Sequence, residues 1–135
     1  MHLIRAIVRD EISRPWWQAL NDGRLLVQRD PRSGALQWYP RGHCLADPLR
    51  PAEWVEVSGR GTLFSFSVIH RSHRKPEQPY VCALVELEEG PLMLSQLTGM
   101  EDHAVHIGMP VRVSFVEFDE DGALPVFVPE TGSRP

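Results

Sequence analysis

The amino-acid sequence predicts a mainly β fold with a short N-terminal helix, a small ribbon and a five-stranded barrel. Three observations support this prediction. Segments of strand length with strand-like apolar patterns recur between residues 62 and 128, and turn residues separate them. Two shorter apolar runs, at 25–28 and 35–39, flank a turn rich in Pro, Ser and Gly. One segment, at 13–23, carries the start and stop signals of a helix.

The predicted helix occupies most of an N-terminal segment, residues 1–24. Ser13 is the expected N-cap, Pro15 suits the first turn, and Gly23 is expected to end the helix. Trp16 and Leu20 are four residues apart and therefore share one face. We expect this face to pack on the rest of the chain or on a partner protein.

The second segment, residues 25–52, has the layout of a zinc ribbon that has lost its ligands. Asp30 with Ser33, and Cys44 with Asp47, occupy the places of two Cys-x-x-Cys knuckles. A structural zinc site needs about four ligands in a tetrahedral array, and only one of the four thiols remains. We therefore predict that zinc is lost and that these four positions are vestigial.

A ribbon this small cannot bury a core of its own and normally needs a metal to hold it. Without a metal, the ribbon must pack against neighbouring parts of the chain. Trp38 and Tyr39 are the obvious residues to make that contact. One alternative stays open, in which His43, Cys44 and the two aspartates form a poor hard-ligand metal site.

The third segment, residues 53–129, is predicted to be a barrel of the OB type. In a strand at 62–69 we expect Phe64, Phe66 and Val68 on one face and serines on the other. The remaining strands are predicted at 80–87, 92–97, 111–118 and 124–128. Five short strands without a convincing helix are typical of a Greek-key OB barrel.

Composition narrows the class of protein. The length of 135 residues suits one compact domain or a domain with a small appendage, and the net charge of −4 disfavours a bulk nucleic-acid binder. Two cysteines fit a reducing cytoplasm, and Cys82 is expected to be a buried, inert thiol. No apolar run suits a signal peptide or a membrane span, so we expect a cytoplasmic protein with a polar tail at 130–135.

A set of short sequence words, in a fixed order between residues 13 and 128, resembles a known family. The words are RPWW (14–17), GRLL (23–26), LQWYPR (36–41), WVEVSGRGTL (54–63), VIHR (68–71), PYV (79–81), IGMPVRV (107–113) and LPVF (124–127). The chain is similar to the acyl-CoA-associated family with a rubredoxin-like zinc ribbon and an OB fold, long catalogued as a domain of unknown function. It departs from the family pattern at the zinc ligands.

The resemblance implies a function. Members of the family are typically accessory subunits of thiolase-like enzymes, hydroxymethylglutaryl-CoA synthase or hydratases in acyl-CoA and sterol side-chain metabolism. They support activity, contribute to acyl-CoA binding or pass intermediates between active sites, and they are not usually catalysts alone. The resemblance therefore implies acyl-CoA as a ligand, with no tightly bound cofactor.

The densest basic cluster of the chain, directly after the first predicted barrel strand, suggests a site for coenzyme A. Clustered Arg and Lys donors suit the phosphates of the coenzyme, and nearby aromatic rings could stack on adenine or pantetheine. The candidate residues are Phe66, His70, Arg71, Arg74, Lys75 and Tyr80. The alternative is a solvated basic loop beside aromatic residues of the core.

Aromatic residues outside the barrel predict a partner interface, because surplus aromatic surface is typical of interfaces. The candidates are Trp16, Trp17, Trp38 and Tyr39.

No G-x-S-x-G, Walker loop or placed acid–base pair is visible, so no catalytic residue is assigned. We therefore expect a non-catalytic accessory subunit. The alternatives are an oligonucleotide-binding OB module and a stand-alone acyl-CoA thioesterase or hydratase.

Overall fold

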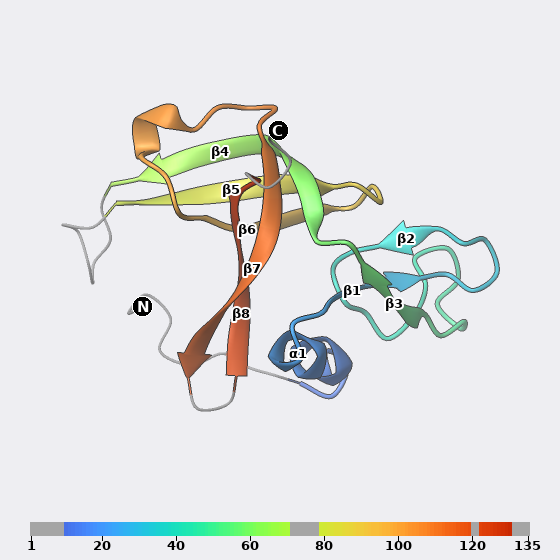
Figure 1. Cartoon of the computed structure of the whole chain (residues 1–135). Helices are drawn as coiled ribbons and strands as arrows, with labels where there is room; N and C mark the ends of the chain where they lie inside the picture. The colour runs from blue at the N-terminus through green and yellow to red at the C-terminus, as the bar shows by residue number, and fades with distance from the viewer. Residues whose placement is uncertain (1–9, 71–78, 120–121, 131–135) are drawn as a thin grey trace.

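The computed structural model describes residues 10–70, 79–119 and 122–130, and it combines a small sheet, a closed barrel and one α-helix (Figure 1). The elements in chain order are α1 (Arg14–Asn21), β1 (Leu25–Arg29), β2 (Leu36–Gln37), β3 (Glu53–Val57), β4 (Arg60–Ile69), β5 (Tyr80–Leu87), β6 (Leu92–Leu97), the 3-10 turn η1 (Asp102–Ala104), β7 (Pro110–Asp119) and β8 (Gly122–Pro129). Figure 1 shows the small sheet to one side of the barrel, with α1 next to β1 and β8. Within the described residues, no helix is long and apolar enough to span a membrane.

The helix forms where the sequence predicts it, but its N-terminus is held differently. Ser13 makes no side-chain cap hydrogen bond. Its hydroxyl donates to Asp10 Oδ1 at 2.7 Å and accepts the indole N–H of Trp17 at 3.1 Å. Ser13 is therefore the N-cap residue as predicted, but its hydroxyl bonds to Asp10 and Trp17 and caps no backbone N–H of the helix. Gly23 follows the helix with a φ of 73°, a left-handed conformation that favours glycine.

The predicted apolar face of the helix is confirmed, and it packs on this chain. Trp16, Ala19 and Leu20 are buried. The helix contacts both β1 and β8, and Asn21 Oδ1 accepts the backbone N–H of Ala123 at 3.0 Å. The helix therefore joins the small sheet to the barrel.

The small sheet has the strand order β2-β1-β3 and is antiparallel throughout. β1 pairs with β3 from Leu25 opposite Val57 to Arg29 opposite Glu53. β3 begins the segment that the sequence assigned to the barrel, yet its backbone pairs with the ribbon. We call residues 25–57 the ribbon below.

The barrel is closed, with the order β4-β5-β6-β8-β7 and β7 returning to pair with β4. This is the five-stranded Greek-key arrangement predicted for the OB type. Its interior is filled by alternate residues of β5, such as Val81, Ala83 and Val85, and by Phe127 of β8. β6 and β8 close the barrel with little pairing, because they share only the pair Leu97–Phe127 among the described residues.

A β-bulge alters the predicted faces of β4. Leu63 pairs with Val85 and Ser65 with Leu84, so Phe64 has no partner of its own on β5. Leu63 is fully buried and Phe64 is 50% exposed, whereas Phe66 packs against the core. The prediction that Phe64 shares a face with Phe66 is therefore wrong, because one inserted residue reverses the alternation of the strand before it.

Candidate functional site

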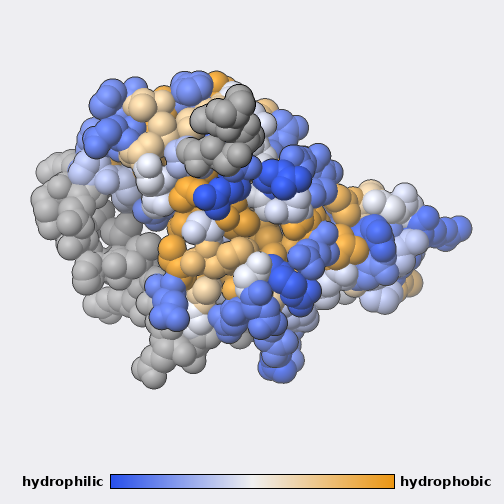
Figure 2. Space-filling model, in the orientation of Figure 1, coloured by the Kyte–Doolittle hydropathy of each residue, from blue (hydrophilic) through white to orange (hydrophobic). Residues whose placement is uncertain are grey.

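A cavity of about 380 Å³ lies where the barrel meets α1 and the ribbon. Apolar surface gathers in the middle of the face shown in Figure 2, between the barrel and the ribbon. The cavity walls combine α1 and the ribbon (Trp16, Trp38), β5 (Tyr80, Cys82), β6 (Met93, Leu94, Ser95, Gln96), β7 (Val116, Glu117) and β8 (Leu124, Pro125, Val126). Most of these side chains are apolar, which is typical of small-molecule sites of this volume.

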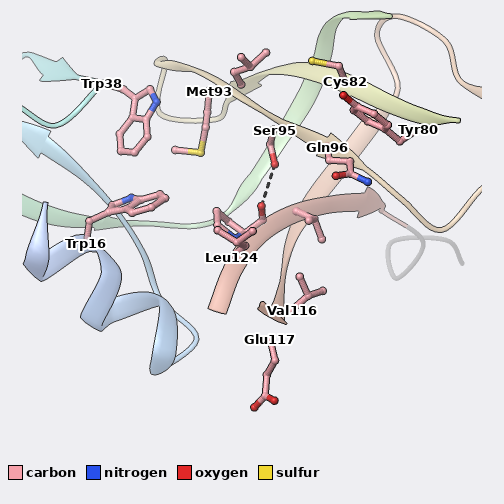
Figure 3. A pocket seen from close by; sticks show the side chains of 13 residues that line it. Trp16, Trp38, Tyr80, Cys82, Met93, Ser95, Gln96, Val116, Glu117 and Leu124 are labelled. Carbon is pink, nitrogen blue, oxygen red and sulfur yellow. Dashed lines mark hydrogen bonds between the residues drawn. The ribbon is translucent and has the colours of Figure 1, made fainter. Parts of the chain in front are cut away.

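The cavity follows the seam between β6 and β8. Beyond the pair Leu97–Phe127 and the bond from Thr98 N–H to the Phe127 carbonyl (2.9 Å), these strands diverge. Pro125 cannot donate a backbone hydrogen bond, and its carbonyl instead accepts the Ser95 hydroxyl at 3.0 Å, the dashed line in Figure 3. This side-chain hydrogen bond therefore joins β6 and β8 at a point where no backbone pairing joins them among the described residues.

Aromatic rings form one end of the cavity. The ring centroids of Trp16 and Trp38 are 5.1 Å apart, and Trp17 and Tyr39 extend the cluster at 4.8 Å and 5.4 Å from these two rings. The structure therefore brings together all four residues predicted for a partner interface. Their exposure differs, because Trp16 is only 7% exposed and Tyr39 is 65% exposed.

The indole N–H of Trp16 is a buried donor in this wall. It has no hydrogen-bond partner among the described residues. An unsatisfied buried donor costs about 1–3 kcal/mol. Trp16 therefore brings one unpaired donor to the aromatic end of the cavity, and its nitrogen is itself almost fully buried.

The other end of the cavity carries Tyr80, Cys82 and Gln96 (Figure 3). Of the predicted coenzyme A residues that the structure describes, only Tyr80 lines the cavity. Phe66 packs against the barrel core, and His70 is exposed at the end of β4. The predicted residues Arg71, Arg74 and Lys75 lie outside the described residues, in the segment that joins Ile69 to its pairing partner Tyr80.

The free thiol of Cys82 is half-buried and faces this cavity, so the prediction of a buried thiol is wrong. The β5 side chains that fill the barrel interior belong to odd-numbered residues, such as Val81 and Ala83. Among the described lining residues there is one carboxylate, Glu117, and no histidine. This set can hold an apolar chain but offers no close acid–base pair.

The vestigial zinc positions meet around a residue that sequence reasoning missed, Arg50. Its Nε donates to Asp30 Oδ1 at 3.0 Å and its Nη2 to Asp30 Oδ2 at 2.9 Å. Its Nη1 donates to Asp47 Oδ2 at 3.1 Å. The bidentate hydrogen bonds from Arg50, with backbone bonds from Arg32 and Ser33, hold the pKa of Asp30 far below its usual range.

Cys44 is fully buried beside this cluster. Burial and the nearby charge of Asp30 raise the pKa of its thiol. A raised pKa keeps the thiol protonated, which disfavours a nucleophilic role. A charge argument could have pointed to Arg50. Two aspartates at the places of ribbon thiols need a nearby cation to balance their charge.

Two buried glutamines, also missed by the sequence reasoning, attach the irregular segment after β2 to the strands. Gln28 exchanges two hydrogen bonds with the backbone of Arg41, at 2.7 and 2.8 Å. Gln37 donates to Gln28 and to the His43 carbonyl and accepts from the N–H of Leu45. The ribbon is therefore joined by side-chain amides as well as by an ion pair.

The residues present do not fit a zinc ion. No group of three or more His, Cys, Asp or Glu side chains in the described parts of the chain is arranged to hold a metal. Both oxygens of Asp30 already accept bonds from Arg50, and the His43 ring lies 2.8 Å from the Cys44 carbonyl. The hard-ligand alternative raised from the sequence therefore finds no support in this arrangement.

Comparisons with known proteins match both parts of the chain. Residues 17–49 match the family model described as "ChsH2, rubredoxin-like zinc ribbon domain", and residues 54–116 match "ChsH2, C-terminal OB-fold domain". A DUF35 domain-containing scaffold protein of Pyrococcus furiosus is 32% identical over 119 residues, which cover 84% of this chain and 87% of that protein.

A longer relative is the 3-oxo-4,17-pregnadiene-20-carboxyl-CoA hydratase alpha subunit of Mycobacterium tuberculosis, 39% identical over 120 residues. The match covers 85% of this chain but only 38% of that subunit. Among solved structures, a chain of "Ltp2-ChsH2(DUF35) aldolase" superposes with a TM-score of 0.81 at 34% identity, covering 93% of this chain and 98% of that one.

Proposed function

The chain belongs to the DUF35 family of scaffold proteins, with a zinc ribbon and an OB fold, and we propose that it is a non-catalytic accessory subunit that binds acyl-CoA. Its partner would be a thiolase-like, hydroxymethylglutaryl-CoA-synthase-like or hydratase enzyme of acyl-CoA metabolism. The relatives support this proposal, because one is a hydratase alpha subunit and another is part of an aldolase named together with Ltp2. The free thiols of Cys44 and Cys82 suit a reducing cytoplasm, where we expect the complex to act.

The observation that carries the proposal is the apolar cavity at the seam between β6 and β8. Its volume of about 380 Å³ is in the range of small-molecule sites. Met93, Leu124 and Val126 offer an acyl chain an apolar wall. The described lining supports binding better than catalysis, because its single carboxylate has no histidine or second carboxylate beside it.

We assign the phosphates of coenzyme A to the basic segment that precedes Tyr80. Arg71, Arg74 and Lys75 supply donors of the kind that bind a pyrophosphate and a ribose phosphate. The segment leaves β4 after Ile69, which pairs with Tyr80 at the cavity wall. Replacing Arg71 and Arg74 together with Ala should weaken acyl-CoA binding by about 1–3 kcal/mol, and the matched control is Arg112→Ala, on β7.

We assign the partner surface to the exposed part of the aromatic cluster and the ribbon beside it. Tyr39 is 65% exposed and Leu49 90% exposed, and both lie in the segment between β2 and β3. Exposed aromatic side chains such as Tyr39 are enriched at protein interfaces. Replacing Trp38 or Tyr39 with Ala should weaken association by about 2 kcal/mol, whereas Ile107→Ala, an exposed apolar residue on the barrel, should not.

The test combines affinity capture from the native extract with activity assays. We expect a thiolase-like or hydratase-like protein to be recovered with the wild-type chain and lost with the Trp38 variant. The purified chain should turn over no acyl-CoA, while the enzyme should depend on it. Robust turnover by the chain alone, with no enzyme recovered, would overturn the proposal and favour a stand-alone acyl-CoA enzyme.

A further inference from the structure

The two halves of the former zinc site are joined by a single side chain. Arg50 follows the second knuckle and bonds back to Asp30, 20 residues earlier, which directly follows β1. The Asp30 side chain is 4% exposed and that of Arg50 is 20% exposed, so this ion pair is largely shielded from water. The third contact, to Asp47, lies within the second knuckle.

We propose that the guanidinium of Arg50 takes the structural place of the zinc ion in this ribbon. In a zinc ribbon the metal cation joins the two knuckles through thiolate ligands. Here a cation built into the chain joins the same positions, and carboxylates replace two of the thiolates. Arginine suits this role because its planar fork bonds a carboxylate through two parallel N–H groups, which a lysine cannot do.

The proposal explains why the surrounding residues differ from those of a metal site. A metal that entered would have to displace a guanidinium that already bonds both oxygens of Asp30. The fourth position, Ser33, carries a hydroxyl that accepts the N–H of Ala35. The remaining thiol, Cys44, is buried with its sulfur 3.6 Å from the Pro51 carbonyl.

Substitution of Arg50 tests this role by thermal unfolding of the full chain. Arg50→Met keeps much of the side-chain length and removes the charge, leaving Asp30 buried and unpaired. Losing one partner of a buried ion pair is expected to lower the Tm by about 10 °C. Arg50→Lys should recover only part of that loss. The matched control, Arg29→Met, removes an exposed ion pair with Glu53 in the same sheet and should change the Tm by no more than about 2 °C.

A metal-restoring variant keeps the proposal testable if Arg50→Met does not fold. The combination D30C, S33C and D47C with R50A, beside the existing Cys44, restores four thiols and removes the internal cation. We expect it to bind one Co²⁺ per chain with the absorption of a tetrahedral thiolate site, and to gain Tm with Zn²⁺. The same three cysteine substitutions with Arg50 kept should bind metal more weakly. An unchanged Tm in Arg50→Met, or a wild-type Tm that falls with a chelator, would overturn the proposal.

A second inference concerns the unused donor in the cavity, and it rests on the proposed function. The indole N–H of Trp16 is unpaired within the described residues, whereas that of the adjacent Trp17 bonds to the Ser13 hydroxyl. The Ser95 hydroxyl in the cavity wall is already donated to the Pro125 carbonyl. Trp16, which lines the aromatic end of the cavity and is more than nine-tenths buried, thus has a donor without a partner among the described residues.

We infer that this donor binds the thioester carbonyl of the acyl-CoA ligand. The acyl group with its thioester carbonyl presents one acceptor on an otherwise apolar chain, and Trp16 carries a buried donor that no described residue satisfies. Binding would remove the cost of the unsatisfied N–H, so a ligand with the carbonyl should gain affinity over one without it. Trp16 would then help select a thioester over other apolar molecules of similar size.

Paired ligands test this inference on the full chain by calorimetry. One is an acyl-CoA, and the other is its thioether analogue, in which a methylene replaces the carbonyl. We expect the thioester to bind about fivefold more tightly to the wild type and no more tightly to Trp16→Phe. The control Trp17→Phe should keep the preference. If neither ligand binds, the proposed function fails; if both bind the wild type equally, only the role of Trp16 fails.

Discussion

The ribbon and the barrel of this chain are stabilised by different kinds of contact. The barrel core contains apolar side chains such as Phe127, Leu63 and Val85. Every buried polar or charged residue among those described lies before the barrel; the four are Ser13, Gln28, Asp30 and Gln37. A unit the size of the ribbon cannot bury enough apolar surface, so directional bonds must supply what the hydrophobic core supplies elsewhere.

The barrel and the ribbon also differ in the role that we assign to each, ligand binding for the barrel and partner binding for the ribbon. The barrel, where β6 and β8 diverge, holds the cavity that we assign to the acyl chain. The ribbon carries exposed apolar residues such as Tyr39 and Leu49, which we assign to the partner enzyme. The internal ion pair of Asp30 and Arg50 joins the two knuckles of the ribbon, and we propose that it takes the place of a metal in holding that surface.

The largest effect is expected from removing the apolar centre of the barrel. Phe127 is fully buried and is the residue of β8 that pairs with β6. Phe127→Ala should lower the free energy of unfolding by about 3–5 kcal/mol, because it loses apolar burial and leaves a cavity. Denaturant unfolding measures this. Phe64→Ala, on the exposed bulge of β4, is the control and should cost less than about 1 kcal/mol.

Acid should act on the ribbon before it acts on the barrel. Hydrogen bonds from Arg50 lower the pKa of Asp30 from its ordinary value of 3.8. A lowered pKa in the folded state means that the stabilisation is complete above the pKa of the unfolded chain and is lost as the pH falls toward the folded-state pKa. Amide exchange followed below pH 4 should therefore show the ribbon opening first. Asp30→Asn should remove this acid dependence, and an identical acid profile in that variant would contradict the assignment.

The side-chain amides of the ribbon can be tested without changing any charge. Gln37 is 5% exposed and bonds Gln28, the His43 carbonyl and the Leu45 N–H. Gln37→Ala should cost about 1–3 kcal/mol, because it leaves these buried groups unpaired. Hydrogen exchange should accelerate in residues 41–45 while the barrel stays protected. Gln18→Ala, on the exposed side of α1, is the matched control.

The smallest effect is expected at the seam. Ser95→Ala removes the bond to the Pro125 carbonyl that bridges β6 and β8 beside the cavity. The cost should be about 1 kcal/mol in unfolding free energy. Because the bond borders the cavity, we also expect altered acyl-CoA affinity, measured by calorimetry. Ser67→Ala, an exposed serine on β4, should change neither quantity.

Local patterns predicted much of the fold. The helix at Trp16 and Leu20 and the five strands of a closed barrel follow from apolar spacing and turn residues, and both are confirmed. The bulge at Phe64 was missed because it adds one residue to an otherwise regular alternation. The pairing of β3 with β1 was missed because strand partners depend on tertiary contacts that spacing does not reveal.

The candidate sites were less predictable. The loss of thiols at Asp30, Ser33 and Asp47 is visible in the sequence, but the partner of Asp30 is 20 residues away and only folding shows it. The cavity is assembled from α1, four barrel strands and the segment that follows β2, so no short motif marks it. Among the residues with a described position, Tyr80 is the one predicted ligand residue in its wall, and Trp16 and Trp38, predicted for a partner, line it as well.

Photo-crosslinking with an acyl-CoA that carries a diazirine on its acyl chain tests the central claim most directly. That claim is that the chain binds the acyl group at the β6–β8 seam. The account predicts labels on peptides that contain Met93 or Leu124, and competition by unlabelled acyl-CoA should remove them. Labels confined to the outer surface of the ribbon, or labelling that unlabelled acyl-CoA does not reduce, would contradict it.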